Sequence, residues 1–316
     1  MISNVKSARA PEYKAARKVR SEVWAGWALV LPALLMVGGF IVVPLVASVV
    51  ISFTSYDLTR TGASWVGLEN YTDLLWKDGS GAGTFLAALR HSFLFGFTSV
   101  AIEFVLGFSL ALLLNQVVRL SGLLRTLLVL PIMIAPTVSA LQWRWILDAD
   151  YGILNYLALQ LGLLDSPQLW LIQPDAAIWT VILVDVWQTT PFVLLFMLAG
   201  LQSLPLGPYE AARVDGAAPL QLFWYLTLPL LRPVILAVLL LRFMDAFRIF
   251  DIVYVLTRGG PAFATDMVSL FTYRTGLQWF EIGKASAAGV LTLLVIAFCA
   301  ALLFSLLGPG RNEERV

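Results

Sequence analysis

Polar and charged side chains interrupt two long apolar runs of this sequence at helical spacing. In one run, Asp185, Gln188 and Thr189 lie at positions i, i+3 and i+4, so a helix would place them on one face. Trp179 and Trp187 belong to the same run. Carboxylate, amide and hydroxyl groups beside aromatic rings suit a polyhydroxylated sugar, which needs several hydrogen bonds and flat apolar contacts. We therefore expect these residues to face a polar pathway, and the alternative is a structural ion-pair network between helices.

The second run carries four charges of alternating sign, three residues apart: Arg242, Asp245, Arg248 and Asp251. On one helix they would form a stripe in which neighbours can pair. A charge at bilayer depth costs about 2.5–3.5 kcal/mol on insertion scales, so the stripe needs a reason. It either faces a polar pathway, which we expect for Asp245, or neutralises itself at a helix interface, which stays open for Arg248 and Asp251. Glu103, in another apolar run, is expected to find an interhelical partner and receives no functional role.

The composition indicates an integral membrane protein. The 316 residues are 59% hydrophobic and only 13% charged, with a mean hydropathy of +0.83, whereas soluble domains are about 25% charged. The single Cys299 excludes a disulfide framework and the single His91 excludes a histidine-rich metal site. We expect no catalytic group, metal site or cofactor on this chain, and a membrane enzyme is the least favoured class.

Six apolar runs are long enough to cross a bilayer as helices, which takes about 20 residues each. They cover residues 24–53, 92–117, 123–147, 176–204, 231–257 and 285–307. The predicted fold is therefore an all-α integral membrane protein, a six-span helical bundle. It would occupy residues 24–307, between a basic N-terminal tail at 1–23 and a short tail at 308–316.

The distribution of Lys and Arg predicts the orientation of the bundle. The two tails and the segments around 119–125 and 213–232 carry twelve basic residues. The opposite set of loops carries five, together with most of the loop carboxylates. The pattern places both termini, and the loop at 205–233, in the cytoplasm.

This cytoplasmic loop is rich in helix-breaking residues. Between them, 209–214 and 220–226 can each form about two turns of helix, joined at Gly216. Glu210 would fall in the first turn, where a negative charge faces the positive end of the helix dipole, with Arg213 placed to pair with it. Such a loop is typical either of a compact connector or of a docking segment. No G-x-x-x-x-G-K-[ST] loop is present, so any ATP would be bound by a partner.

The same loop resembles the EAA loop of ABC importer permeases. The matching residues are Glu210-Ala211-Ala212, then Gly216, then Leu226-Thr227-Leu228-Pro229. Leu226 stands where the family commonly has Ile, a conservative exchange. The resemblance implies an ATPase-coupling site formed by Glu210, Ala211, Ala212, Asp215 and Gly216.

Longer passages resemble the carbohydrate-uptake branch of these permeases, in particular the larger membrane subunit of maltose- and trehalose-type importers. The passages are Phe250 to Pro261, Trp143 to Gly152, and Trp187 to Phe192 with Leu201 to Pro205. The resemblance covers about residues 24 to 307. It implies a non-catalytic permease subunit that forms half of the path for a disaccharide or oligosaccharide such as maltose or trehalose. A polyol or glycerol phosphate is the alternative cargo, and a secondary transporter the alternative machine.

The resemblance also implies a site and a set of partners. Counting without gaps from Glu210, the sugar-contacting positions of the maltose system fall on Asp185, Gln188, Thr189, Phe192, Arg242, Asp245, Ala246 and Ile249. The implied partners are a second homologous permease, a dimer of ATPase subunits that binds ATP and Mg, an extracytoplasmic sugar-binding protein, the sugar and the lipid bilayer, with no nucleic acid. The implied location is the cytoplasmic (inner) membrane of a bacterium, and the implied mechanism is alternating access.

Overall fold

The computed structural model describes residues 26–79, 81–116 and 121–308, and these ranges are largely helical. Five helices in them are long and apolar enough to cross a membrane, or six if one bent pair counts as a span. The five are Gly26–Ile51, Phe85–Gln116, Pro174–Gln202, Pro219–Leu256 and Ile282–Leu307. The predicted all-α bundle is confirmed. The predicted tail at 1–23, and the tail at 308–316 beyond Gly308, lie outside the described residues.

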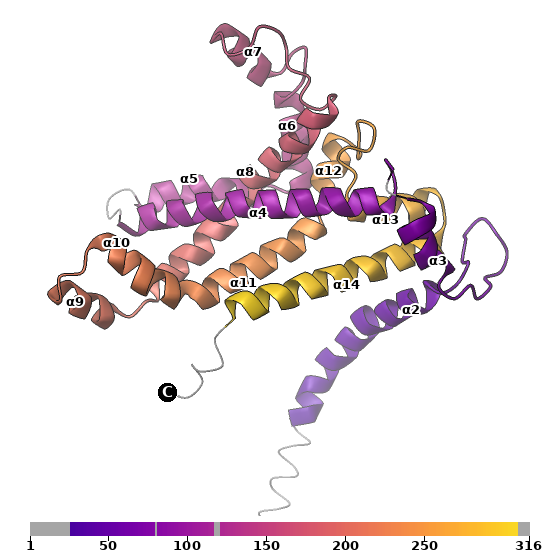
Figure 1. Ribbon diagram of the computed structural model, residues 1–316, viewed down its shortest axis with the longest axis horizontal. Helices are drawn as coiled ribbons and strands as arrows, with labels where there is room; N and C mark the ends of the chain where they lie inside the picture. The colour runs from indigo at the N-terminus through magenta and orange to yellow at the C-terminus, as the bar shows by residue number, and fades with distance from the viewer. Residues whose placement is uncertain (1–25, 80, 117–120, 309–316) are drawn as a thin grey trace, which may run out of the picture.

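Three helices form the centre of the bundle: α4 (Phe85–Gln116), α8 (Pro174–Gln202) and α11 (Leu228–Phe247). Helix α4 lies along α8, and α14 (Ile282–Leu307) packs beside α11 (Figure 1). The approach of α4 to α8 requires Gly107, because a Cβ added there would lie 2.7 Å from the Cβ of Val193. Small residues allow close helix packing where lipid supplies no hydrophobic drive.

The third predicted span is a broken helix. Helices α5 (Ser121–Met133) and α6 (Pro136–Ile146) are bent by 95° at the break between them. Ala135 is extended, with ψ 136°, and Pro136 opens α6. The proline ring disfavours the helical conformation in the preceding residue, which explains why the chain breaks here. Beyond α6, the short helix α7 (Ile153–Gln160) leads back to α8.

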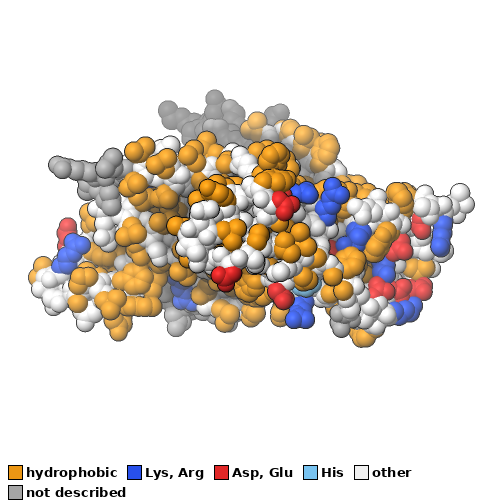
Figure 2. All heavy atoms as spheres, turned by 90° about the horizontal axis from the view of Figure 1, so that it is seen from above, with side chains coloured by type: hydrophobic (Ala, Val, Ile, Leu, Met, Phe, Trp, Pro, Cys, Tyr) orange, Lys and Arg blue, Asp and Glu red, His pale blue; other side chains and the backbone are white. Residues whose placement is uncertain are grey.

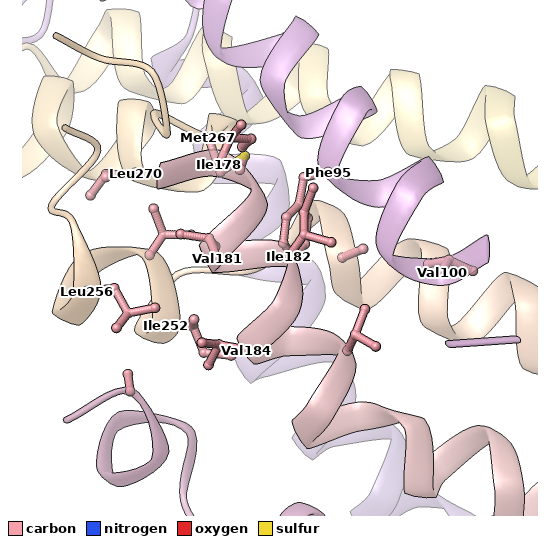
Figure 3. Close-up of a cluster of buried hydrophobic side chains, with 14 of the residues drawn as sticks. Phe95, Val100, Ile178, Val181, Ile182, Val184, Ile252, Leu256, Met267 and Leu270 are labelled. Carbon is pink, nitrogen blue, oxygen red and sulfur yellow. The ribbon is translucent and has the colours of Figure 1, made fainter. Parts of the chain in front are cut away.

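Two buried apolar clusters join these helices at different positions along their length. One joins α4, α8 and α12 (Asp251–Leu256) through residues such as Phe95, Val181 and Ile252 (Figure 3). A second joins α4, α8 and α11 through residues such as Phe108 and Leu194. The polar residues described below lie along α4 and α8 between these two clusters.

The first span lies at the margin of the bundle. Its helical parts η1 (Gly38–Val42) and α2 (Val43–Ile51) carry no buried residue, and α2 packs on α14. Figure 1 shows this span diverging from the other helices toward the N-terminal end. Its surface is almost entirely apolar, as suits a segment surrounded by lipid or by another membrane helix.

Short elements lie at the two ends of the bundle (Figure 1). At one end are α9 (Leu206–Val214), α10 (Pro219–Leu222) and the π-helical turn η3 (Phe223–Thr227). At the other are α3 (Glu69–Thr72), α13 (Val268–Tyr273) and the turns η2 (Asp73–Lys77) and η4 (Arg274–Gln278). Figure 2 shows apolar side chains over much of the molecule and charged ones gathered mainly toward the α3–α13 end. This distribution fits a bundle whose middle lies in a bilayer.

Candidate functional site

The loop at 205–233 forms a compact protrusion of paired short helices. As predicted, two helical segments meet at Gly216, whose φ is +82°. The Gly216 amide donates to the Arg213 carbonyl at 3.1 Å, and the Ala217 amide donates to the Ala212 carbonyl at 2.9 Å. This pair of hydrogen bonds is the Schellman pattern, in which glycine supplies the left-handed conformation that ends a helix. Gly216 therefore fixes the sharp turn of the protrusion.

Glu210 does not occupy the predicted position in the first turn. Helix α9 begins at Leu206, after the extended Pro205, and its first turn holds Pro208 and no acidic residue. Proline is tolerated in the first turn because an amide there has no intrahelical acceptor. The helix can therefore begin before Pro208, whereas the sequence predicted that it begins after this residue. Glu210 and Arg213 are both exposed, and no salt bridge joins them in the described part of the chain.

A hydrogen bond closes the protrusion on itself. The Tyr209 hydroxyl donates to Thr227 Oγ1 at 3.0 Å, which ties α9 to η3 immediately before α11 begins. The outer surface of the protrusion remains apolar in places: Val214 is 87% exposed and Tyr225 is 78% exposed. Exposed apolar side chains on a stiff projection are typical of a contact surface for another protein.

A cleft of about 390 Å³ opens between the α5–α6 break, α8 and the junction of α11 with α12. Seven of the eight residues predicted to contact the cargo line it: Asp185, Gln188, Thr189, Arg242, Asp245, Ala246 and Ile249. Helical spacing explains most of this convergence, because the three α8 residues share one face and Arg242, Asp245 and Ala246 share a face of α11. Ile249 follows the end of α11. Phe192 is absent from the lining. It packs on Phe196, with ring centroids 4.5 Å apart, against the second apolar cluster.

An ion cluster is buried beside the cleft. The Arg242 guanidinium donates from Nε to Glu103 Oε2 at 2.7 Å and from Nη2 to Glu103 Oε1 at 2.9 Å. The same Nη2 donates to Asp185 Oδ2 at 3.1 Å. The side chains of Arg242, Glu103 and Asp185 are at most 7% exposed. Buried charges of this kind are tolerated because they are paired and hydrogen-bonded.

Two polar neighbours extend this cluster. Thr189 Oγ1 lies 2.8 Å from Glu103 Oε1 and 2.6 Å from the backbone oxygen of Asp185. The Gln188 amide donates to the backbone oxygen of Ile134 at 3.0 Å, at the break between α5 and α6. Gln188 Oε1 is buried and has no hydrogen-bond partner. A buried acceptor without a partner is costly, so it is a candidate contact for a bound molecule.

The predicted charge stripe is broken by the end of α11. The helix ends at Phe247, Arg248 caps it, and Asp251 opens α12. Arg248 and Asp251 are exposed and line the cleft, and within the described ranges neither forms a salt bridge. Arg242 pairs with carboxylates of α4 and α8 rather than with a neighbour in the stripe. Among the described residues, the charges of this segment therefore do not neutralise one another, and Arg242 instead joins an ion-pair network between helices.

The aromatic residues expected beside the cargo lie elsewhere. Trp179 and Trp187 line a separate, apolar groove of about 830 Å³ along α4, α5 and α8. Phe250 is the aromatic side chain that lines the polar cleft, and it stacks on Tyr254 with centroids 5.2 Å apart. Tryptophan and cleft residues share a helix but point to different sides of it.

Glu103 belongs to the ion cluster, although no functional role was predicted for it from the sequence. Its position as an acidic residue within an apolar run predicted a partner on another helix, and that partner is Arg242. Its two carboxylate oxygens contact two cleft-lining residues, Arg242 and Thr189, while Glu103 itself lies outside the lining.

A polar cleft inside an all-helical membrane bundle, with a paired-helix protrusion at one end, is the arrangement expected of a membrane permease. Residues 79–313 match the family of binding-protein-dependent transport system inner membrane components. The chain belongs to this family, and it is accordingly a multi-pass transport component rather than an enzyme.

Similar proteins of the same length are permease subunits. The chain is 38% identical over 278 residues to the trehalose/maltose transport system permease protein MalF of Thermococcus litoralis, covering 88% of this chain and 92% of that protein. It is 30% identical over 277 residues to the sulfoquinovosyl glycerol transport system permease protein SmoG of Agrobacterium fabrum, covering 87% of each. The crystal structure of a bacterial alginate ABC transporter, in complex with an alginate pentasaccharide-bound periplasmic protein, contains a similar fold. Its TM-score is 0.78 at 23% identity, covering 92% of this chain and 96% of that one.

Proposed function

We propose that this chain is a permease subunit of a binding-protein-dependent ABC importer and forms half of the path for a sugar, a disaccharide or oligosaccharide such as maltose or trehalose. One observation carries the proposal: seven of the eight predicted cargo-contacting residues, on α8, on α11 and just beyond the end of α11, line a single polar cleft. Hydroxyl groups of a sugar match the carboxylate, amide and hydroxyl groups of that lining. The similarity to a trehalose/maltose permease supports the same class of cargo.

The protrusion is the proposed coupling site for a separate ATPase subunit, through Glu210, Ala211, Ala212, Asp215 and Gly216. Its support is the exposed apolar surface and the turn fixed by Gly216. ATP and Mg are held by the ATPase dimer, and this chain contributes no cofactor site. The remaining partners are a second homologous permease and an extracytoplasmic sugar-binding protein. Both termini and the protrusion face the cytoplasm of a bacterial cell, as the distribution of basic residues indicates.

The first test is ATP hydrolysis by the complete complex in proteoliposomes, with its binding protein and a panel of disaccharides and oligosaccharides. We expect one or more sugars to stimulate hydrolysis in the wild type. Glu210→Lys reverses the charge of an exposed residue on the protrusion, so it should abolish the stimulation and leave the bundle folded.

Asp165→Lys is the matched control, because Asp165 is also exposed and lies in the loop between α7 and α8. It should retain the stimulation. A complex whose hydrolysis ignores every sugar, or whose Glu210→Lys variant transports sugar without ATP, would instead be a secondary transporter.

A further inference from the structure

Two carboxyl groups share one guanidinium in the cluster of Glu103, Arg242 and Asp185, so the cation of this cluster is committed to carboxyl partners. The rest of the cleft lining adds two exposed carboxylates, Asp245 and Asp251, and one exposed guanidinium, Arg248. A cargo with its own negative charge would therefore face more exposed carboxylates than guanidinium groups, and like charges at short range repel.

Glu103 determines how Arg242 is presented. Both oxygens of its carboxylate accept from Arg242 in a bidentate pair, the geometry that fixes a guanidinium most firmly. The same carboxylate contacts the Thr189 hydroxyl. Glu103 lies on α4, whereas Arg242 and Thr189 lie on α11 and α8. The Glu103 side chain thus holds two lining residues, Arg242 and Thr189, in position although it does not itself line the cleft.

The lining that remains for a cargo is rich in acceptors. Gln188 Oε1 is buried without a hydrogen-bond partner, while the amide nitrogen of the same side chain donates to the backbone oxygen of Ile134. Asp185 uses Oδ2 for Arg242, and Asp245 forms no salt bridge among the described residues. Acceptors of this kind are satisfied by hydroxyl donors and are left unsatisfied by a carboxylate, sulfonate or phosphate.

We propose that Glu103 is a positioning residue that commits Arg242 to carboxylates, so that the cleft selects hydroxyl-rich cargo without a negative charge. This proposal rests on the proposed function, because it assumes that the cleft is the sugar path. It assigns to this half of the path a cargo class that excludes uronic acids, sulfonated sugars and sugar phosphates.

The experiment compares initial uptake of isotopically labelled maltose, trehalose and glucuronosyl-glucose by the complete complex in proteoliposomes, at sugar concentrations that saturate the binding protein. All variants share one binding protein, so a change in the ratio of anionic to neutral uptake originates in this chain. The wild type is expected to take up a neutral sugar and to exclude the anionic one.

Glu103→Gln removes one negative charge and leaves Arg242 paired with Asp185 alone. It should lower neutral uptake and raise the anionic-to-neutral ratio about tenfold, the effect of one charge-assisted hydrogen bond. Hydrolysis in the absence of sugar, measured on the same preparations, shows whether the variant complex has assembled. Glu281→Gln, at an exposed carboxylate before α14, is the matched control and should leave the ratio unchanged.

Glu103→Asp provides a second variant if the first fails to assemble. It keeps the charge but shortens the side chain, which breaks the bidentate pair and partly releases Arg242, so the ratio should rise by less than in Glu103→Gln. A ratio that stays constant in whichever variant assembles would overturn the proposal, since a merely structural residue would lower all uptake equally. A wild type that prefers the anionic sugar would overturn it too, yet leave sugar import standing. A wild type stimulated by no sugar would reject the proposed function itself.

Discussion

Arg242 connects three helices through a single guanidinium group. It lies on α11 and pairs with Glu103 on α4 and Asp185 on α8, and all three side chains are nearly inaccessible. Removing one partner from a buried ion pair leaves the other charge uncompensated, which costs more than the intact pair contributes. The cluster therefore shapes the cleft, and the bundle is sensitive to the loss of any one of its members.

The stability consequence is a prediction at Arg242. Arg242→Leu leaves two buried carboxylates without a cation, so it should lower stability by about 3–5 kcal/mol. Thermal melting of the purified chain in detergent would measure the loss. Arg248→Leu removes an exposed guanidinium that forms no salt bridge among the described residues, and it should stay within about 0.5 kcal/mol of the wild type. Equal melting of both variants would show that the buried pairing is not stabilising.

Helix periodicity was sufficient to predict one face of the cleft. The i, i+3, i+4 spacing of Asp185, Gln188 and Thr189 predicts one face, and all three line the cleft. The partner of Arg242 was not predictable, because an i+3 neighbour and a carboxylate on another helix satisfy the same pattern. The position of Phe192 also depended on tertiary packing, since it is three residues beyond Thr189 but faces an apolar cluster.

The protrusion shows how few residues determine a supersecondary element. Its turn depends on the left-handed conformation of Gly216, at a point where an added side chain would meet no neighbour. Any effect of substitution there therefore arises from the backbone rather than from a clash. Gly207, in α9, is equally free of neighbours but has no such conformation.

This contrast gives a prediction with a built-in control. Gly216→Ala should cost about 1–2 kcal/mol locally, the penalty for a left-handed L-residue, and should reduce sugar-stimulated ATP hydrolysis by disturbing the angle between α9 and α10. Gly207→Ala should be neutral or slightly stabilising, because alanine favours helix. Parallel hydrolysis assays with matched expression levels would separate the two. Equal activity in both variants would contradict a coupling role for the turn.

The helix-breaking residues of this loop predicted that it contains two short helices, but they did not predict where those helices begin and end. The prolines and Gly216 located two short helices, but Pro208 lies inside α9 rather than before it. The same ambiguity affected the third span. Pro131 is inside α5 while Pro136 marks a 95° bend, and the sequence contains both prolines without distinguishing them. Tertiary contacts, including the hydrogen bond from Gln188 to Ile134, stabilise the break.

At the scale of the whole molecule, the apolar middle and the two different ends imply a fixed orientation. The protrusion formed by α9 and α10 and the segment around α7 should lie on opposite sides of the membrane. Cysteine labelling tests this in a Cys299→Ala background. We expect Val214→Cys to react with an impermeant maleimide only in inverted vesicles, and Leu163→Cys only in intact cells. Both positions are exposed, at 87% and 72%. Labelling of both from one side would reject the orientation.

The hydrogen bond between Tyr209 and Thr227 has a mechanical consequence. The turn η3 continues directly into α11. The protrusion, held by the hydrogen bond from Tyr209 to Thr227, and Arg242 therefore belong to one continuous helical segment. Arg242 is about 20 Å along α11 from Leu228 at 1.5 Å per residue, so a tilt of roughly 5° at the protrusion would displace its Cα by nearly 2 Å. That displacement is comparable to the margin between a hydrogen bond and none. The ion cluster thus lies far enough along α11 from the protrusion that a small rotation of this helix is enough to rearrange the contacts of the cleft.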